Sequence, residues 1–495
     1  MSKVRTIITT DMEVDDMNSM IHLCLYLNEI NLLGVIYTSS QYHFNGDGVH
    51  TLGEVTPHYR TSGPTGLERP RTSYGPDPDA KDLKCFRPFP MGWIEKLWQG
   101  PYADAYPYLK QHDETFPTPE HLLDITKYGN IEFEGDVRFD TEGSNLIKKY
   151  LLDDDMEPIY LQSWGGINTI VRALLSIYDE YHESEDWNRI YNKVVSKTRI
   201  LGVTKHVGQD NSYIDAMIPE LYPDLICLST EYLYGLYNAS NAAQKDCVDM
   251  FKGKWMLENI HNHKSTLMDA YHLMGDGRRI PGEADIYQFG LTSVLDFGFP
   301  GTKPIQMNPY DFVGEGDSNT YIPLFEFGLR GLENYNYPTL LGRLFIDESK
   351  KPKAGNPMTG EGILFNPFIK AYQEDFAARA EWCYLEYKNA NHAPIVEVED
   401  FDINGKPGQT VDLKVFVKEP DGDDYSVVWE HYDNFSSYSG SESIRVFEPE
   451  KECTSLTIPS DAQAGDYIVL ILRVQDKANK PMTSYGQVVV HVEIG

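Results

Sequence analysis

Near its amino terminus the chain reads Arg5-Thr-Ile-Ile-Thr-Thr-Asp11-Met-Glu-Val-Asp15-Asp16-Met-Asn-Ser-Met20-Ile-His-Leu23. The apolar and β-branched residues before Asp11 predict a buried strand. The residues after it predict a helix, because apolar positions recur at helical spacing at Met20, Leu23, Leu27 and Ile30. Asp11 is therefore expected at a strand end, and Asp15 and Asp16 in the first helical turn. With Glu13 as a fourth candidate, carboxylates crowd one strand-to-helix corner.

Two explanations fit this crowding. Acids at a helix start cap free amide groups and complement the helix dipole, which accounts for Asp15 and Asp16. Asp11 gains nothing in this way, because it lies before the helix begins. The other explanation is a bound cation, since gathered like charges raise one another's energy and hard oxygen ligands suit Ca²⁺ or Mg²⁺. The local pattern leaves both open.

The spacing Asp11-x-x-x-Asp15-Asp16 resembles the aspartate cluster of calcium-dependent nucleoside hydrolases, which cleave the bond between ribose and a base. That family usually has an aspartate two residues before the first metal aspartate and Pro-Gly after it. This chain has Thr9 and Met12-Glu13 there. The departure resembles a bacterial nucleoside hydrolase-like family of unsettled substrate, some of whose members are called cellulose-binding proteins and which carries an extra carboxyl-terminal β domain.

The resemblance implies one bound Ca²⁺, in preference to Mg²⁺, with Asp11, Asp16, Asp317 and the backbone carbonyl of Trp164 as ligands. It also implies that Asp11 removes a proton from the attacking water and that Asp15 orients sugar hydroxyls. Nucleoside hydrolases often have a histidine before the distant aspartate, where it assists departure of the base. This chain has Gly316 there. The glycine weakens the expectation of a nucleobase leaving group and favours an O-linked sugar or an unusual glycoside.

Further candidates follow the predicted strands, because ligands of parallel sheets gather at strand carboxyl ends. The substrate-binding candidates are Gln41, His43, Glu142 and Asn168, and the resemblance implies Gln209, Asp210 and Asn211 as well, in the loop where the family binds sugar hydroxyls. An ordinary loop histidine is the alternative for His43, and a solvated turn that caps a helix is the alternative for residues 209–211. His263 is the candidate that protonates the leaving group, with His43 or no general acid as the alternatives.

The alternation of strands and helices predicts the domain organisation. Predicted strands at 31–38, 158–162, 198–203 and 225–228, separated by helical stretches, indicate a doubly wound, mostly parallel α/β sheet over residues 1–390. The pattern then becomes alternating, with predicted strands at 411–417, 425–429, 454–458, 467–474 and 486–492. This pattern indicates an immunoglobulin-like β-sandwich over residues 391–495. The sandwich is expected to brace the first domain or to bind polysaccharide through exposed aromatic residues.

Composition narrows the functional classes. A formal charge of −32 argues against nucleic acid and anionic membranes as partners, since the electrostatic interaction would be repulsive. The six cysteines form no CxxC pair, so neither zinc nor a disulfide framework is indicated. The residues from 46 to about 90 form a long stretch rich in Gly and Pro, and such loops are commonly lids or oligomer contacts, which makes a homodimer one expectation. The chain as written is expected in the cytoplasm, or secreted or periplasmic if a leader was removed.

The sequence therefore predicts a metal-dependent hydrolase of N- or O-glycosyl bonds in a nucleoside-like or small sugar substrate, with an oligosaccharide also compatible. The alternative is a carbohydrate-binding protein, for cellulose or another polysaccharide, that keeps the hydrolase fold without catalysis. Gly316 favours the alternative, whereas the presence of Asp11, Asp15, Asp16 and Asp317 favours the enzyme.

Overall fold

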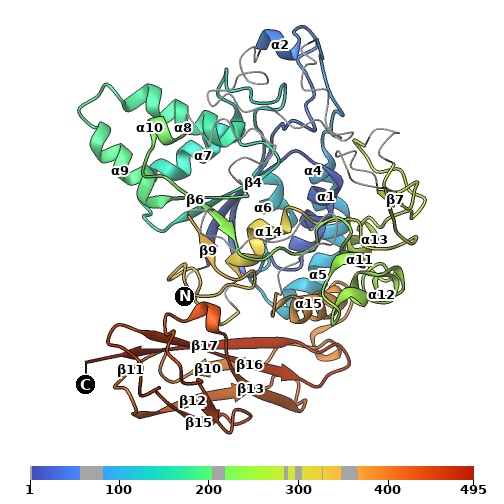
Figure 1. The fold of residues 1–495 in the computed structure, drawn as a ribbon. Helices are drawn as coiled ribbons and strands as arrows, with labels where there is room; N and C mark the ends of the chain where they lie inside the picture. The colour runs from blue at the N-terminus through green and yellow to red at the C-terminus, as the bar shows by residue number, and fades with distance from the viewer. Residues whose placement is uncertain are drawn as a thin grey trace. The chain divides into compact units, whose positions relative to one another are not determined.

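The computed structural model describes residues 3–55, 82–202, 218–283, 288–295, 304–325, 327–346 and 366–494. The chain divides into two compact units. The first comprises Met1–Ser229, Leu233–Tyr321 and Phe345–Phe365, and the second comprises Thr230–Tyr232, Ile322–Leu344 and Asn366–Gly495. Figure 1 shows the elements of each unit.

The first unit is built on a parallel sheet. Its strands are β1 (Val4–Thr10), β2 (Ile30–Tyr37), β3 (Thr126–Tyr128), β4 (Ile159–Trp164), β5 (Thr198–Leu201) and β6 (Ile226–Thr230). They lie in the order β3-β2-β1-β4-β5-β6, followed by the short strand β9 (Leu344–Phe345). The pairs from β3 to β6 are all parallel. The strand order reverses between β1 and β4, and ligands of open α/β sheets bind at this reversal.

Helices cover both faces of this sheet. On one face α7 (Glu142–Leu152), α8 (Asn168–Tyr181) and α9 (Trp187–Lys197) share a hydrophobic core with Ile7, Leu161 and Ile200. Gln162 follows Leu161 on β4 and therefore points to the other face. There it accepts a hydrogen bond from Thr320 of α14 (Ser318–Tyr321), which packs against α1 (Val14–Leu23). The predicted doubly wound, mostly parallel fold is confirmed.

Short elements complete the first unit. They are α2 (Leu52–Val55), α4 (Trp93–Leu97), a π-helical turn (Trp98–Tyr102), α5 (Ala103–His112), α6 (Pro119–Asp124), α10 (Ile218–Leu221), α11 (Ala239–Ala242), a 3-10 turn (Val248–Phe251), α12 (Gly253–Asn259), α13 (Thr266–Asp269), β7 (Val294–Leu295) and β8 (Ile305–Gln306). The stretch from Tyr232 to Phe251 is mostly irregular. Gly235 and Asn238 adopt left-handed backbone there, with φ of 53° and 73°, which interrupts a helix.

One helix end differs from the prediction. Helix α1 ends at Leu23 and β2 already begins at Ile30, so Leu27 and Ile30 are buried outside the helix. Their spacing reflected burial and not helical periodicity. Helix α7 is capped by Thr141, and Ser144 at the third helical position accepts a hydrogen bond from the Thr141 N–H at 2.8 Å.

The second unit contains two four-stranded sheets. One has the order β10 (Ile395–Val398), β12 (Thr410–Lys418), β15 (Cys453–Thr457), β14 (Val446–Phe447), and the other β11 (Asp402–Gly405), β17 (Thr483–Val492), β16 (Tyr467–Asp476), β13 (Tyr425–His431). All pairs are antiparallel except β11 with β17. Alternate residues such as Leu413, Trp429 and Leu470 form a common core. The antiparallel sheets are confirmed, and their immunoglobulin-like character stays a prediction.

One of these sheets is covered on its outer face. Helix α15 (Ile369–Trp382) packs against β17, a 3-10 turn (Tyr387–Asn389) follows it, and another 3-10 turn spans Ile322–Leu324. The backbone N–H of Arg330 donates to the Gln487 side chain at 2.9 Å. The domain boundary after residue 390 stays a prediction. The two compact units divide the chain differently, since α15 belongs to the second unit. Among the described residues, no helix combines the length and the apolar character needed to cross a membrane.

Candidate metal and active site

Asp11 lies at the sharp corner where β1 ends. Met12 adopts left-handed backbone with φ of 61°, and its N–H donates to the Thr10 hydroxyl at 3.1 Å. The Thr10 hydroxyl in turn donates to Asp16 at 2.5 Å. This short turn folds the start of α1 back toward the strand end. The corner predicted from the sequence therefore exists, and it gathers the aspartates by local hydrogen bonds.

The end of β4 meets this corner at the point where the strand order reverses. The Asp11 N–H donates to the Trp164 carbonyl at 3.1 Å. The next residue, Gly165, has φ of 95°, and a Cβ on it would lie 2.5 Å from Asp11 Cγ. Only glycine allows this approach. Because a carbonyl oxygen has two lone pairs, that of Trp164 keeps one for a further partner.

Asp317 lies close to these aspartates although it is far from them in the sequence. Asp15, Asp16 and Asp317 each offer a carboxylate oxygen, and these oxygens lie within 4.8 Å of one another. The negative charge of Asp11 also reaches Asp317, whose pKa it helps to raise. Residues about 300 positions apart therefore meet in one cluster, which we call the aspartate cluster: Asp11, Asp15, Asp16 and Asp317.

Among the described residues, no Lys or Arg forms an ion pair with the aspartate cluster. Burial, followed by repulsion between the carboxylates, raises the pKa of Asp11, Asp16 and Asp317 well above the usual range. The same causes raise the pKa of Asp15 to about 7. Among the described residues, Asp11 Oδ2 and Asp15 Oδ1 are buried without a hydrogen-bond partner. Such a cluster binds either protons or a cation.

A buried polar network fixes Asp317 relative to α1. His22 of α1 lies 2.8 Å from Glu315, and both side chains are inaccessible to solvent. Glu315 also accepts hydrogen bonds from Ser318, at 2.6 Å, and from Tyr271. The Ser318 Oγ lies 3.0 Å from the Ser19 Oγ of α1, within hydrogen-bond distance. Because this network lies on both sides of Asp317 in sequence, it sets the position of that carboxylate. Sequence reasoning missed it, although His22 on a buried helix face was a usable signal.

A second cluster lies beside the first. The Arg87 guanidinium donates to Glu13 at 3.1 Å and also to Glu283. His43 lies beside Arg87 and Glu13. Its Nδ1 is 2.5 Å from the Arg87 carbonyl oxygen, and its Nε2 is 3.5 Å from Glu13. Burial and the nearby Arg87 charge lower the pKa of His43 to about 3. Arg87 and Glu283 come from irregular loops, so no periodicity marked them in the sequence.

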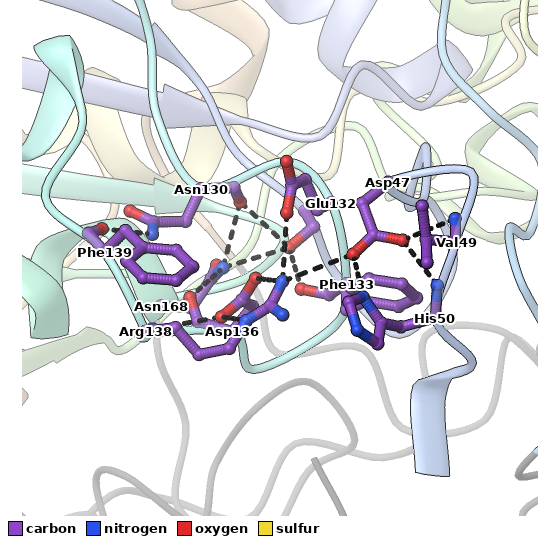
Figure 2. A network of polar contacts seen from close by, with 11 residues as sticks. Asp47, Val49, His50, Asn130, Glu132, Phe133, Asp136, Arg138, Phe139 and Asn168 are labelled. Atoms are coloured by element: carbon purple, nitrogen blue, oxygen red, sulfur yellow. Dashed lines mark hydrogen bonds and ion pairs between the residues drawn. The ribbon is translucent and has the colours of Figure 1, made fainter. Parts of the chain in front are cut away.

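The structure gives Asn168 a bracing role. Its side-chain amide donates to the Asn130 carbonyl and to the Ser39 hydroxyl, both at 3.0 Å. Its oxygen accepts from Thr38 at 2.9 Å. Figure 2 shows this network and its continuation through Arg138, whose guanidinium contacts Asp47, Glu132 and Asp136. The buried amide of Asn168 therefore ties together the loops after β2 and β3.

The remaining predicted site residues lie in different surroundings. Gln41 is buried in the loop after β2, and Glu142 is exposed at the start of α7. The side chain of His263 is 74% exposed, and its Nδ1 lies 3.2 Å from Asp269. Its described contacts are with Asp269 and His261 and do not include the aspartate cluster. Gln209, Asp210 and Asn211 lie outside the described residues.

Comparisons with known proteins agree with this architecture. The chain matches the family described as "Cellulose-binding Sde182, nucleoside hydrolase-like domain" over residues 5–344. Residues 410–492 match the family described as "Cellulose-binding protein Sde0182, C-terminal domain". Among curated proteins, no match was found.

Solved structures were compared as well. A nucleoside hydrolase-related hypothetical protein from Saccharophagus degradans, described as associated with carbohydrate metabolism, has a TM-score of 0.67 at 22% identity, covering 99% of this chain and 100% of that chain. VCBP3 domain 1 from Branchiostoma floridae and murine CRIg have TM-scores of 0.15 at 12% and 13% identity. They cover 20% of this chain and 94% and 98% of their own chains. The chain belongs to the cellulose-binding Sde182 family, through its nucleoside hydrolase-like domain.

Proposed function

We propose that the aspartate cluster holds one Ca²⁺ ion and that the chain hydrolyses a glycosyl bond in a nucleoside-like or small sugar substrate. The observation that carries this proposal is the meeting of Asp15, Asp16 and Asp317, whose carboxylate oxygens lie within 4.8 Å of one another. They meet at the reversal of strand order, where ligands of such sheets bind.

The donor set fits calcium. Every side-chain donor of the aspartate cluster is a carboxylate oxygen, and Ca²⁺ prefers six to eight oxygen ligands. Asp11 Oδ2 and Asp15 Oδ1 are buried without a hydrogen-bond partner among the described residues, so they have lone pairs to give. In the described part of the chain, the four carboxylates form no ion pair with Lys or Arg. We assign Asp11, Asp16, Asp317 and the Trp164 carbonyl as ligands, with Asp15 positioned to share the ion or to bind sugar hydroxyls.

The residues of the cluster have separate chemical roles. A bound Ca²⁺ would supply positive charge that lowers the pKa of a water molecule and orients it. Asp11, fixed by its N–H bond to Trp164, removes a proton from that water as it attacks the anomeric carbon. The remaining carboxylates stabilise the positive charge that develops on the sugar ring in an oxocarbenium-like transition state.

We propose that the leaving group needs little protonation by the enzyme. Gly316 provides no proton donor beside Asp317. His263 is exposed beside Asp269, and His43 is buried against Arg87. Neither histidine has a described contact with the aspartate cluster. A leaving group that departs without strong protonation by the enzyme is therefore favoured.

The test compares Asp11→Ala and Asp11→Asn with the wild type on a panel of nucleosides and small glycosides, with release of free base or reducing sugar as the readout. We expect both substitutions to lower kcat by about 10²–10⁴-fold while circular dichroism shows an unchanged fold. Glu183→Gln, an exposed change, is the matched control. Retained turnover in Asp11→Ala would contradict the role of Asp11 as the base. Full activity of the metal-free wild type would contradict the role of Ca²⁺.

A second candidate function is carbohydrate binding by the second unit. On the sheet that contains β12 and β14, Phe416 and Phe447 are 51% and 60% exposed. Phe447 pairs with Ser455, and Ser455 with Asp412, four residues before Phe416 on β12. The two rings therefore stand on one outward face. In the other sheet, helix α15 packs against β17.

The family descriptions, which read "cellulose-binding", agree with this second candidate. Sedimentation with insoluble cellulose tests it. We expect Phe416→Ala with Phe447→Ala to reduce the bound fraction at least several-fold, since aromatic faces carry much of sugar stacking. Phe139→Ala, an exposed aromatic of the first unit, is the control. Equal binding by all three proteins would exclude this face.

A further inference from the structure

A second group of metal-binding side chains lies beside the aspartate cluster. Glu13, His43 and Glu283 each offer one donor atom, and these atoms lie within 4.8 Å of one another. The three side chains are 7%, 0% and 3% exposed. They come from three separate segments: the residue before α1, the loop after β2 and the loop after α13. Their convergence is therefore a product of the tertiary fold.

The hydrogen bonds of His43 determine which ring nitrogen is free. Its Nδ1 lies 2.5 Å from the Arg87 carbonyl oxygen. A carbonyl oxygen only accepts, so Nδ1 carries the hydrogen. A buried imidazole beside a guanidinium group is neutral, and its Nε2 therefore has a lone pair and no hydrogen. This Nε2 lies 3.5 Å from Glu13 Oε1, so two acceptors face each other without a hydrogen between them.

The charge and hydrogen bonds of Arg87 balance only part of the group formed by Glu13, His43 and Glu283. It donates to Glu13 Oε1 at 3.1 Å and to Glu283 Oε2. Two acceptors remain: His43 Nε2 and Glu283 Oε1 are buried and have no hydrogen-bond partner among the described residues. One guanidinium also leaves a net negative charge on two carboxylates. Buried lone pairs that converge in a negative environment are stabilised by a cation.

We infer that Glu13, His43 and Glu283 form a second metal site, which takes a divalent transition-metal ion such as Zn²⁺ or Mn²⁺. An imidazole nitrogen combined with carboxylates suits such ions, whereas the all-oxygen aspartate cluster suits calcium. The second site is close to the first, because the Glu13 N–H lies 3.4 Å from Asp11 Oδ1. The two sites share none of their assigned ligands, so the inference does not rest on the proposed hydrolysis.

The experiment titrates Zn²⁺ alone into the full-length protein after treatment with chelator, with calorimetry for affinity and elemental analysis for stoichiometry. We expect one tight equivalent in the wild type and at least a 100-fold weaker affinity in His43→Ala and Glu283→Gln. Asp317→Asn should keep the tight Zn²⁺ site, because Asp317 is not one of its ligands. Cobalt substitution provides a second readout, since a His ligand gives visible absorption bands that His43→Ala should lose.

A matched control excludes adventitious binding. His261, His263 and Asp269 form another group of close donor atoms, and the His263 side chain is 74% exposed. His263→Ala should leave the tight equivalent unchanged. Thermal melting of His43→Gln, which keeps the side-chain size, checks that loss of binding is not loss of folding.

The outcomes separate this inference from the proposed function. No tight Zn²⁺ equivalent in the folded wild type would overturn the second site, and so would its loss in His263→Ala. Absence of Ca²⁺ binding or turnover, with Zn²⁺ binding intact, would overturn the proposed function and leave the second site in place.

Discussion

Gly316 and Asp15 approach each other so closely that a Cβ on Gly316 would lie 2.5 Å from Asp15 Oδ2. This contact explains why the position before Asp317 has no side chain. A histidine there would require the buried Asp15 carboxylate to move. The glycine is therefore part of the cluster geometry, and its effect on the leaving group follows from that geometry.

Replacing Gly316 tests this contact. Gly316→Ala is expected to displace the Asp15 carboxylate and to weaken Ca²⁺ affinity by about 10-fold or more, as loss of supporting contacts does at metal sites. Calorimetric titration with Ca²⁺ measures the change. Gly100→Ala, where a Cβ meets no atom within 4 Å, is the control. Equal Ca²⁺ affinity in Gly316→Ala and the wild type would contradict the interpretation.

Asp317→Asn should have opposite effects with and without metal. In chelator it removes one of several repelling carboxylates, so we expect a higher melting temperature than that of the wild type. With Ca²⁺ present it removes a ligand, so the stabilisation by the ion should be largely lost. Differential scanning calorimetry in both conditions measures the two effects. A destabilised metal-free variant would show that the favourable contacts of the Asp317 carboxylate outweigh its repulsion by the other aspartates.

The metal-free protein should lose stability as pH rises. The pKa of Asp15 is raised from 3.8 to about 7 in the folded state, so its folded form binds a proton more tightly than its unfolded form does. The resulting stabilisation is complete below pH 3.8 and is lost as pH rises through about 7. Asp15 alone corresponds to a loss of roughly 4 kcal/mol in the free energy of unfolding. The raised pKa values of Asp11, Asp16 and Asp317 act in the same direction.

Urea unfolding at about pH 5 and about pH 8, with chelator or with Ca²⁺, checks this prediction. A bound divalent cation holds the carboxylates ionised, so the loss of stability should be much smaller with Ca²⁺. A metal-free protein that is equally stable at both pH values would contradict it.

Glu315 is a positioning residue for Asp317. Glu315→Gln keeps the shape but replaces the acceptor that faces His22 by a group with a donor, which should loosen the loop before α14. We expect Ca²⁺ affinity to fall by about 10–100-fold. Glu183→Gln, with its side chain 89% exposed, is the control. Stability lost without any change in Ca²⁺ affinity would indicate a purely structural role.

Asn168→Ala should destabilise the fold and leave substrate affinity unchanged. The substitution leaves the buried Asn130 carbonyl and the Ser39 and Thr38 hydroxyls without their amide partner. Each of these groups keeps another hydrogen-bond partner, so the cost is that of the lost hydrogen bonds, about 0.5–1.5 kcal/mol each. Chemical unfolding measures the stability, and KM of an active preparation measures the substrate role. A large rise in KM with normal stability would support the predicted substrate-binding role of Asn168.

Local pattern was enough to predict the elements that build the site. The strand that ends before Asp11 and the aspartates in the first turn of α1 follow from residue types and spacing over fewer than about 20 positions. The change to alternating residues likewise predicted five strands of the second unit. The strands β10, β11 and β14 were missed, because two to four residues carry too little periodicity.

Residue pattern predicted the parallel sheet, the acidic corner after β1 and the β-rich carboxyl-terminal part, because each depends on short-range periodicity and turn chemistry. Which distant side chains meet became clear from the three-dimensional fold. In the fold, Asp317 lies close to Asp15 and Asp16. The Asn168 side chain binds the Asn130 carbonyl, and Arg87 pairs with both Glu13 and Glu283. The physical reason is that contacts between irregular loops depend on how the sheet and its helices pack, and residue spacing along the chain carries no record of that packing.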